Sequence, residues 1–168
     1  MMNRYQTLAA CLAATLLVPA VGGPALAQVV EGEEHCVINV AVADRLNVRE
    51  EPGVGSDIVA RLRYATCGIV VTGECDGNWC PIEDGHVDGW VNSRFISMVS
   101  PALYCVTNVA DDDVLNMRAF PSPASRIVTE LDPDQCDIAF LPYAVGGWQK
   151  VRADGYEGWV RRTYVSGE

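Results

Sequence analysis

The sequence predicts an all-β protein of two small barrels in tandem, preceded by an export signal. Three observations support this prediction. The 168-residue chain repeats itself at a fixed offset, each repeat consists of short apolar runs separated by turn residues, and the N-terminus resembles a secretion signal followed by an even number of cysteines. We take the export signal first, because it determines the chemistry expected of the cysteines.

Residues 1–27 have the three regions of a secretory signal peptide. Arg4 gives a positive start, residues 8–18 form an apolar segment, and residues 25–27 (Ala-Leu-Ala) form a small-residue cleavage motif. The apolar segment ends at Pro19 and is too short to cross the ~30 Å hydrocarbon core of a membrane. We therefore expect cleavage after Ala27, a periplasmic or secreted protein, and no stable membrane insertion. Cys11 imitates a lipidation motif, but it precedes most of the apolar segment where such a cysteine should follow it.

The chain contains an internal repeat with an offset of 69 residues. Cys36 aligns with Cys105, and the alignment continues without a gap to Ser97 over Ser166. Of the 62 aligned positions 22 are identical, where chance would give roughly four. The chain therefore contains two homologous modules, residues 36–97 and 105–166. Residues 28–35 form an acidic lead-in, and residues 98–104 form a linker.

Each module has the pattern of an all-β domain. Apolar runs rich in β-branched residues are separated by Gly, Pro, Asn and Asp, and no run keeps a helical period over a typical helix length. In the first module the expected strand segments are 36–42, 46–49, 57–62, 68–74, 79–83 and 89–97. Five or so short strands in about 60 residues favour a strongly bent barrel, because a sandwich needs more strands.

Two long motifs occur in both modules. The first module has LNVREEPGVGSDIVARL and later GWVNSRFIS, and the second has LNMRAFPSPASRIVTEL and later GWVRRTYVS. These motifs resemble the bacterial SH3 domain family over residues 36–166. The resemblance implies an SH3-like barrel for each module and a role as an envelope binding module, since such domains typically accompany peptidoglycan hydrolases or stand alone. The Cys-His peptidase domain that often accompanies the family has no counterpart in this sequence.

Two residue pairs have expected structural roles in this fold. The side chains of Asn47 and Asn116 are expected to bond the backbone of the long loop that follows each of them. Gly89 and Gly158 each precede a tryptophan, where we expect either a positive φ or a close backbone approach.

The tryptophans divide into two classes. Trp90 and Trp159 are expected to fill the barrel cores, because a module of about 60 residues has little other apolar mass to bury. Trp79 and Trp148 follow turns and are the candidates for a surface groove that contacts a ligand.

Two tyrosines complete the set of candidate groove residues. Segment 102–115 resembles the start of a eukaryotic proline-binding SH3 domain, which places a groove beside the loop 111–125, near Tyr104 and Trp148. The first module has Glu-Glu-His-Cys where this segment has Ala-Leu-Tyr-Cys, which argues against that likeness. Tyr143 is the fourth candidate.

The repeat also sorts the six cysteines that follow the signal. Cys36 and Cys67 are separated by 31 residues, as are Cys105 and Cys136, so the simplest pairing is one equivalent disulfide per module. Cys75 and Cys80 have no cysteine counterparts in the second module, and their spacing suits a disulfide across a β-hairpin.

Two chemical alternatives for Cys75 and Cys80 are weaker. A zinc site would recruit His86 with Asp84 or Asp88, but the spacing fits no common zinc motif, and thiols in an oxidising compartment pair with each other first. A redox couple would need the tighter Cys-x-x-Cys spacing at a helix N-terminus. We expect neither a metal nor a cofactor.

The composition predicts a binding protein without catalytic activity. His35 and His86 are the two histidines, and neither lies in a setting that suggests a Ser-His-Asp triad. The formal net charge of −10 excludes nucleic acid as a natural partner and favours a basic one. We expect an exported module that recognises a cell-wall peptide or an envelope protein segment. The alternative is a regulatory subunit or inhibitor of an envelope enzyme.

Overall fold

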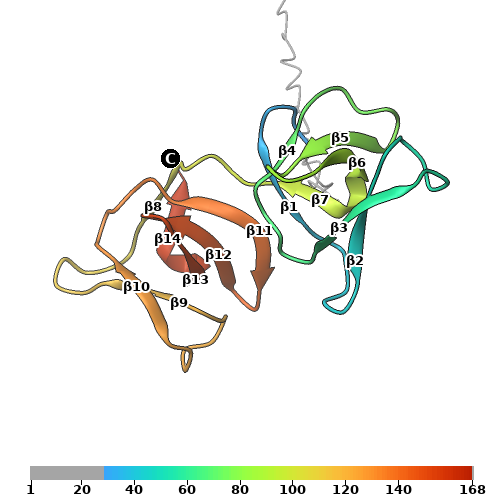
Figure 1. Ribbon diagram of the computed structural model, residues 1–168. Helices are drawn as coiled ribbons and strands as arrows, with labels where there is room; N and C mark the ends of the chain where they lie inside the picture. The colour runs from blue at the N-terminus through green and yellow to red at the C-terminus, as the bar shows by residue number, and fades with distance from the viewer. Residues whose placement is uncertain (1–28, 168) are drawn as a thin grey trace, which may run out of the picture.

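The computed structural model describes residues 29–167 and shows two β-barrels side by side (Figure 1). The expected signal peptide and Cys11 lie outside the described residues. No helix within residues 29–167 is long and apolar enough to cross a membrane. The all-β prediction is confirmed.

Each barrel is built from seven short strands and one 3-10 turn. The first barrel contains β1 (Glu34–Val37), β2 (Arg45–Arg49), β3 (Ile58–Arg63), β4 (Ile69–Val71), β5 (Trp79–Glu83), β6 (Asp88–Asn92), η1 (Ser93–Phe95) and β7 (Ile96–Met98). The second contains β8 (Tyr104–Val106), β9 (Leu115–Arg118), β10 (Ile127–Leu131), β11 (Ala139–Val145), β12 (Trp148–Ala153), β13 (Tyr156–Arg161), η2 (Arg162–Tyr164) and β14 (Val165–Gly167).

The two barrels have equivalent topologies. The first is one antiparallel sheet in the order β3-β2-β6-β5-β4-β1-β7. In the second, β10-β9-β13-β12-β11 form one sheet and β14-β8 another. A bridge between Tyr104 and Ile138, the residue just before β11, places β8 beside the start of β11. It occupies the position of the His35–Ile69 pair in the first barrel, so the strand order is the same in both.

Two of the expected strands are interrupted. The run 36–42 is extended only to Val37, and Asn39 adopts a positive φ of 55°. The run 89–97 is divided by η1, whose first turn is capped because the side chain of Asn92 accepts a hydrogen bond from the backbone N–H of Arg94. Both interruptions lie beside the candidate site described below.

The barrel cores consist of aliphatic side chains from alternating strand positions. The first contains Val48, Ile69, Ile82 and Val91, and the second contains Met117, Leu131, Ile138 and Val160, all at most 1% exposed. The prediction that Trp90 and Trp159 fill these cores is wrong. Since neighbouring strand residues point to opposite faces, the burial of Val91 and Val160 turns the preceding tryptophan outward, and both tryptophans are only half-buried.

The close approach expected at Gly89 and Gly158 is confirmed. A Cβ on Gly89 would lie 2.7 Å from the carbonyl oxygen of Arg49, and a Cβ on Gly158 would lie 2.5 Å from Cγ of Met117. Neither glycine has a positive φ. In each barrel, therefore, the sixth strand can lie against the second only if this position has no side chain.

Three disulfides join Cys36 to Cys67, Cys75 to Cys80, and Cys105 to Cys136. The hairpin disulfide of the first barrel is replaced in the second by an amide. Gln149 lies at the position of Cys80, is buried, and donates through Nε2 to the carbonyl oxygens of Leu141 (2.7 Å) and Tyr143 (3.1 Å). The same hairpin is thus held covalently in one barrel and by hydrogen bonds in the other.

The barrels pack against each other through a third cluster of buried side chains, which includes Cys36, Val99, Leu141 and Tyr143. The hydroxyl of Tyr143 donates to the carbonyl oxygen of Val37 at 2.8 Å. The linker takes part in this contact, because Val99 is 7% exposed and the backbone N–H of Ser100 donates to the carbonyl oxygen of Phe140.

An ion pair also connects the two barrels. Arg152 donates to both carboxylate oxygens of Glu34, at 2.7 and 2.9 Å, and also contacts Glu157. The hydrogen bonds from Arg152 lower the pKa of Glu34 below its ordinary value of 4.5. A carboxyl whose pKa is lower in the folded state stabilises the fold above the unfolded pKa, and this contribution is lost as the pH falls through the folded value.

We therefore expect Glu34→Gln to lower the free energy of unfolding by about 1 kcal/mol at pH 7, a figure kept small because the pair is partly solvated. The difference from the unmodified protein should shrink as the pH falls through the lowered pKa of Glu34, because the wild-type carboxyl is then increasingly protonated. Urea denaturation at pH 7 and at successively lower pH values measures this, with Glu130→Gln as the exposed-carboxylate control. A difference that stays constant over the whole acidic range in which the protein is folded would show that the loss does not come from the ionised carboxylate.

Candidate functional site: two equivalent grooves

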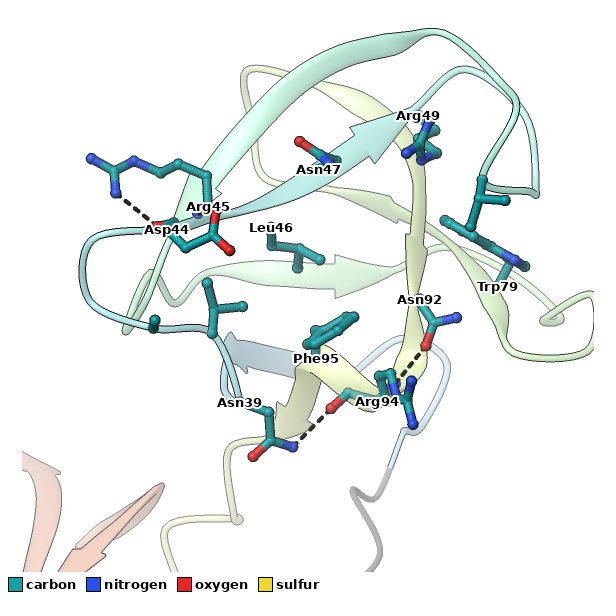
Figure 2. Close-up of a pocket in the computed structure, with 13 residues that line it drawn as sticks. Asn39, Asp44, Arg45, Leu46, Asn47, Arg49, Trp79, Asn92, Arg94 and Phe95 are labelled. Carbon is teal, nitrogen blue, oxygen red and sulfur yellow. Dashed lines mark hydrogen bonds between the residues drawn. The ribbon is translucent and has the colours of Figure 1, made fainter.

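Each barrel has a groove at the same place. The first groove is lined by Asn39, Val40, Ala41, Asp44, Arg45, Leu46, Asn47, Arg49, Val54, Trp79, Asn92, Arg94 and Phe95 (Figure 2). The second is lined by Asn108, Val109, Ala110, Asp113, Val114, Leu115, Asn116, Arg118, Pro123, Trp148, Arg161 and Tyr164. Each of the twelve positions in the second groove corresponds, at the 69-residue offset, to one in the first, and eight of the twelve are identical.

The groove has an apolar floor between polar walls. In the first barrel Leu46 and Phe95 lie in the middle, Trp79 lies at one end, and Asp44 and Arg45 lie at the other (Figure 2). Trp79 reaches the groove from the first position of β5 and is half-buried. The side chains therefore offer an aromatic surface beside charged groups.

One wall of each groove is positioned by an asparagine. The side-chain amide of Asn39 donates to the carbonyl oxygen of Arg94 at 2.9 Å, and that of Asn108 donates to the carbonyl oxygen of Thr163 at 3.1 Å. Both asparagines have a positive φ, 55° and 57°, which asparagine adopts more readily than most residues. These bonds tie the loop after the first strand to the 3-10 turn, so the same groove shape forms twice.

The opposite wall is positioned by an arginine. Arg49 donates to the carbonyl oxygen of Ser56, and Arg118 donates to that of Ser125 at 2.7 Å. In each barrel the serine Oγ also accepts a backbone N–H from the start of the same loop. We expected the side chains of Asn47 and Asn116 to hold this loop. In the structure the arginine and the serine of each barrel hold it, and the two asparagines line the groove.

The grooves carry a local excess of positive charge on an acidic protein. Arg45, Arg49 and Arg94 line the first groove with Asp44 as the single acid, and the second has two arginines against Asp113. The basic partner favoured by the net charge does not suit these surfaces. A guanidinium matches carboxylate geometry and favours an anionic group.

The structure brings two of the four candidate groove residues into the grooves. Trp79 and Trp148 line equivalent positions, whereas Tyr104 and Tyr143 lie elsewhere. The Tyr104 ring stacks on Phe140 at 3.6 Å between centroids. Tyr143 is buried between the barrels, and burial raises the pKa of its hydroxyl far above the ordinary value. These placements exclude the tyrosines from the groove that was expected near Trp148.

The groups weighed for metal or redox chemistry have other roles. Cys75 and Cys80 form a disulfide, so neither is a thiolate available to bind zinc with His86. His35 is fully buried. Its Nδ1 donates to the carbonyl oxygen of Glu33 at 2.8 Å, its Nε2 accepts the backbone N–H of Val30 at 3.1 Å, and burial lowers its pKa. This neutral ring anchors the acidic lead-in to the first barrel.

Several groove residues were missed from the sequence although a signal was present. Asn39, Asp44 and Arg49 are each identical to their counterparts in the second module. A search for polar residues that are identical in both copies and lie outside the expected core would have found them. The sequence interpretation instead followed aromatic residues and, for Tyr104, the likeness of segment 102–115 to a proline-binding SH3 domain; Tyr104 and Tyr143 line neither of the two grooves.

The bacterial SH3 domain family model matches residues 44–97 and 113–166, more than half of the chain. The chain therefore belongs to the bacterial SH3 domain family. Both matched regions contain most of the groove that the structure shows.

Two solved structures are also similar. NlpC2 from Trichomonas vaginalis has a TM-score of 0.38 and 12% identity, with the match covering 82% of this chain and 48% of that one. NlpC1 from the same organism has a TM-score of 0.38 and 11% identity, covering 85% and 49%. The chain spans about half the length of each. No curated protein matches it.

Proposed function

We propose that this protein is an exported, non-catalytic binding module that recognises a carboxylate-bearing peptide of the cell wall through its grooves. The observation that carries the proposal is the duplicated groove. Eight of its twelve shared lining positions are identical, against 22 of 62 over the whole repeat. The groove has thus diverged less between the copies than the rest of the module.

The chemistry of the lining supports a peptide ligand. An aromatic face beside an apolar floor can pack against peptide methylenes, and arginines at the rim can pair with carboxylates. Peptidoglycan stem peptides offer both kinds of group. Bacterial SH3 domains are typically non-catalytic modules that bind cell-wall components, and three disulfides suit an extracytoplasmic protein.

Co-sedimentation with purified sacculi tests the proposal. We expect the mature protein to pellet with sacculi at low salt and less at high salt, because ion pairs with arginine are screened. The double variant Trp79→Ala, Trp148→Ala should lose at least about tenfold in affinity, a loss typical of removing buried aromatic anchors. Circular dichroism would establish that the variant is folded.

Trp90→Ala supplies the matched control. Trp90 is also half-buried but lies outside the grooves, in a depression with Val59 and Pro81, so this variant should pellet like the unmodified protein. Failure of the unmodified protein to pellet at any salt concentration would contradict the proposal. Capture of one stoichiometric envelope enzyme, without sacculus binding, would instead support the regulatory alternative.

A further inference from the structure

We infer that the two grooves are functionally unequal: the first presents an accessible indole and is the binding site, whereas in the second Arg161 closes off the face of the Trp148 indole. This inference rests on the proposed function for the identity of the ligand, but the closure itself is a property of the fold. It makes Asn92 and Arg161, which occupy equivalent positions, the residues that determine which groove binds.

In the second groove, a side chain of the protein itself lies over the tryptophan. Trp148 and Arg161 are directly opposite each other on β12 and β13. The guanidinium carbon of Arg161 lies 4.9 Å from the centroid of the Trp148 ring, and its Nη1 donates to the carbonyl oxygen of Gly146 at 3.1 Å. A guanidinium over an indole face is attracted by the electron-rich ring. Trp148 is 7% exposed.

The first groove lacks this cover. Trp79 has Asn92 as its cross-strand partner on β6. Asn92 is short and neutral, and its Oδ1 accepts the backbone N–H of Arg94 at 3.3 Å, which directs it toward the 3-10 turn. Trp79 is half-buried, so part of its ring surface faces the groove and is free to pack against a peptide.

The two grooves also differ in the charge offered to a ligand. The first has Arg45 and Arg94 at positions where the second module has Val114 and Thr163. Arg161, the additional cation of the second groove, is engaged with Trp148 and Gly146. The volumes are about 360 Å³ for the first groove and about 490 Å³ for the second. Arg45 and Arg94 make contacts of their own, with the carbonyl oxygen of Asp44 and the ring of Phe95, but neither lies over the groove tryptophan. The inequality therefore lies in the accessible aromatic face, not in size.

A reciprocal exchange tests the role in binding. The probe is a soluble peptidoglycan stem tripeptide of alanine, glutamate and diaminopimelate, titrated by calorimetry. We expect one site per chain in the unmodified protein and about tenfold weaker binding in Asn92→Arg, equivalent to about 1.4 kcal/mol. Arg161→Asn should add a second site. Both residue types already occur at this position of the fold, so both variants should remain folded.

A second measurement tests closure without any ligand. Brief treatment with N-bromosuccinimide, followed by mass mapping of peptides, measures how fast each indole is oxidised. Trp79 should react at least several-fold faster than Trp148 in the unmodified protein, and Arg161→Asn should remove most of that difference. Equal rates in the unmodified protein would overturn closure, whatever the calorimetry shows.

The two experiments separate the two claims. If the tripeptide and the sacculi both fail to bind while Trp148 remains protected, the proposed function is wrong and closure stands. If the tripeptide binds, but Trp148→Ala weakens binding as much as Trp79→Ala, the inequality of the grooves is wrong and the proposed function stands.

Discussion

Replacing Cys105 and Cys136 with alanine should lower the free energy of unfolding by about 4 kcal/mol. The disulfide closes a loop with a sequence separation of 31. The chain-entropy model gives about this value for a loop of that length, because the cross-link restricts the unfolded chain. The whole net stability of so small a barrel is of the same order. We therefore expect the second barrel to be largely unfolded at 37 °C, as measured by circular dichroism and urea denaturation.

The hairpin disulfide provides the internal control. Cys75 and Cys80 are separated by only 5 positions, so Cys75→Ala, Cys80→Ala should cost about 2 kcal/mol by the same model. The second barrel shows that this hairpin forms without a cross-link, since Gln149 holds it through its amide. If the hairpin variant were as unstable as the Cys105–Cys136 variant, loop length would not explain the contribution of the disulfides.

Gly158→Ala is the second change with a large expected effect. The added Cβ would lie 2.5 Å from Cγ of Met117 and 2.9 Å from the carbonyl oxygen of Arg118. Met117 is fully buried, so relief requires moving a core side chain and separating β13 from β9. Overpacking of this kind costs about 3 kcal/mol, which should appear as a lower urea midpoint.

Gly55→Ala is the matched control for this prediction. No atom lies within 4 Å of a Cβ built on Gly55, and its φ is not positive. The expected change in unfolding free energy is within about 0.5 kcal/mol. A Gly158→Ala protein as stable as Gly55→Ala would mean that the two strands do not approach as closely as the structure indicates.

The fold was largely predictable because the sequence contains the same module twice. The 69-residue repeat located the modules, and the positions of short β-branched runs located most strands. The error at Trp90 and Trp159 has a simple physical origin. Size and hydrophobicity favour burial of tryptophan, but strand alternation allows only one of two neighbours to face the core. At both sites the smaller valine fills the interior.

The contact between the barrels could not be predicted from the repeat. Tyr143 and Arg152 form its polar contacts, yet their counterparts in the first module are Glu74 and Glu83. A repeat reveals what two modules have in common, whereas a contact between them needs residues that differ. The positive charge of the grooves was hidden for a related reason, because a net charge of −10 gives no information about where a few arginines gather.

The candidate site was predicted in part. Trp79 and Trp148 were chosen because they follow turns and recur in both modules, and the structure places both in grooves. The covering of Trp148 by Arg161 depends on cross-strand register, which no local sequence pattern reveals.

Chemical-shift mapping tests the central claim most directly. The isotopically labelled mature protein is titrated with the stem tripeptide, and shifts are followed at backbone amides and indole N–H groups. We predict the largest shifts at the Trp79 indole and at the amides of Leu46 and Arg94, with small shifts at Trp90. Saturating peptide without shifts in this groove, or shifts centred between the barrels at Tyr64 and Trp159, would contradict the assignment of the groove as the binding site.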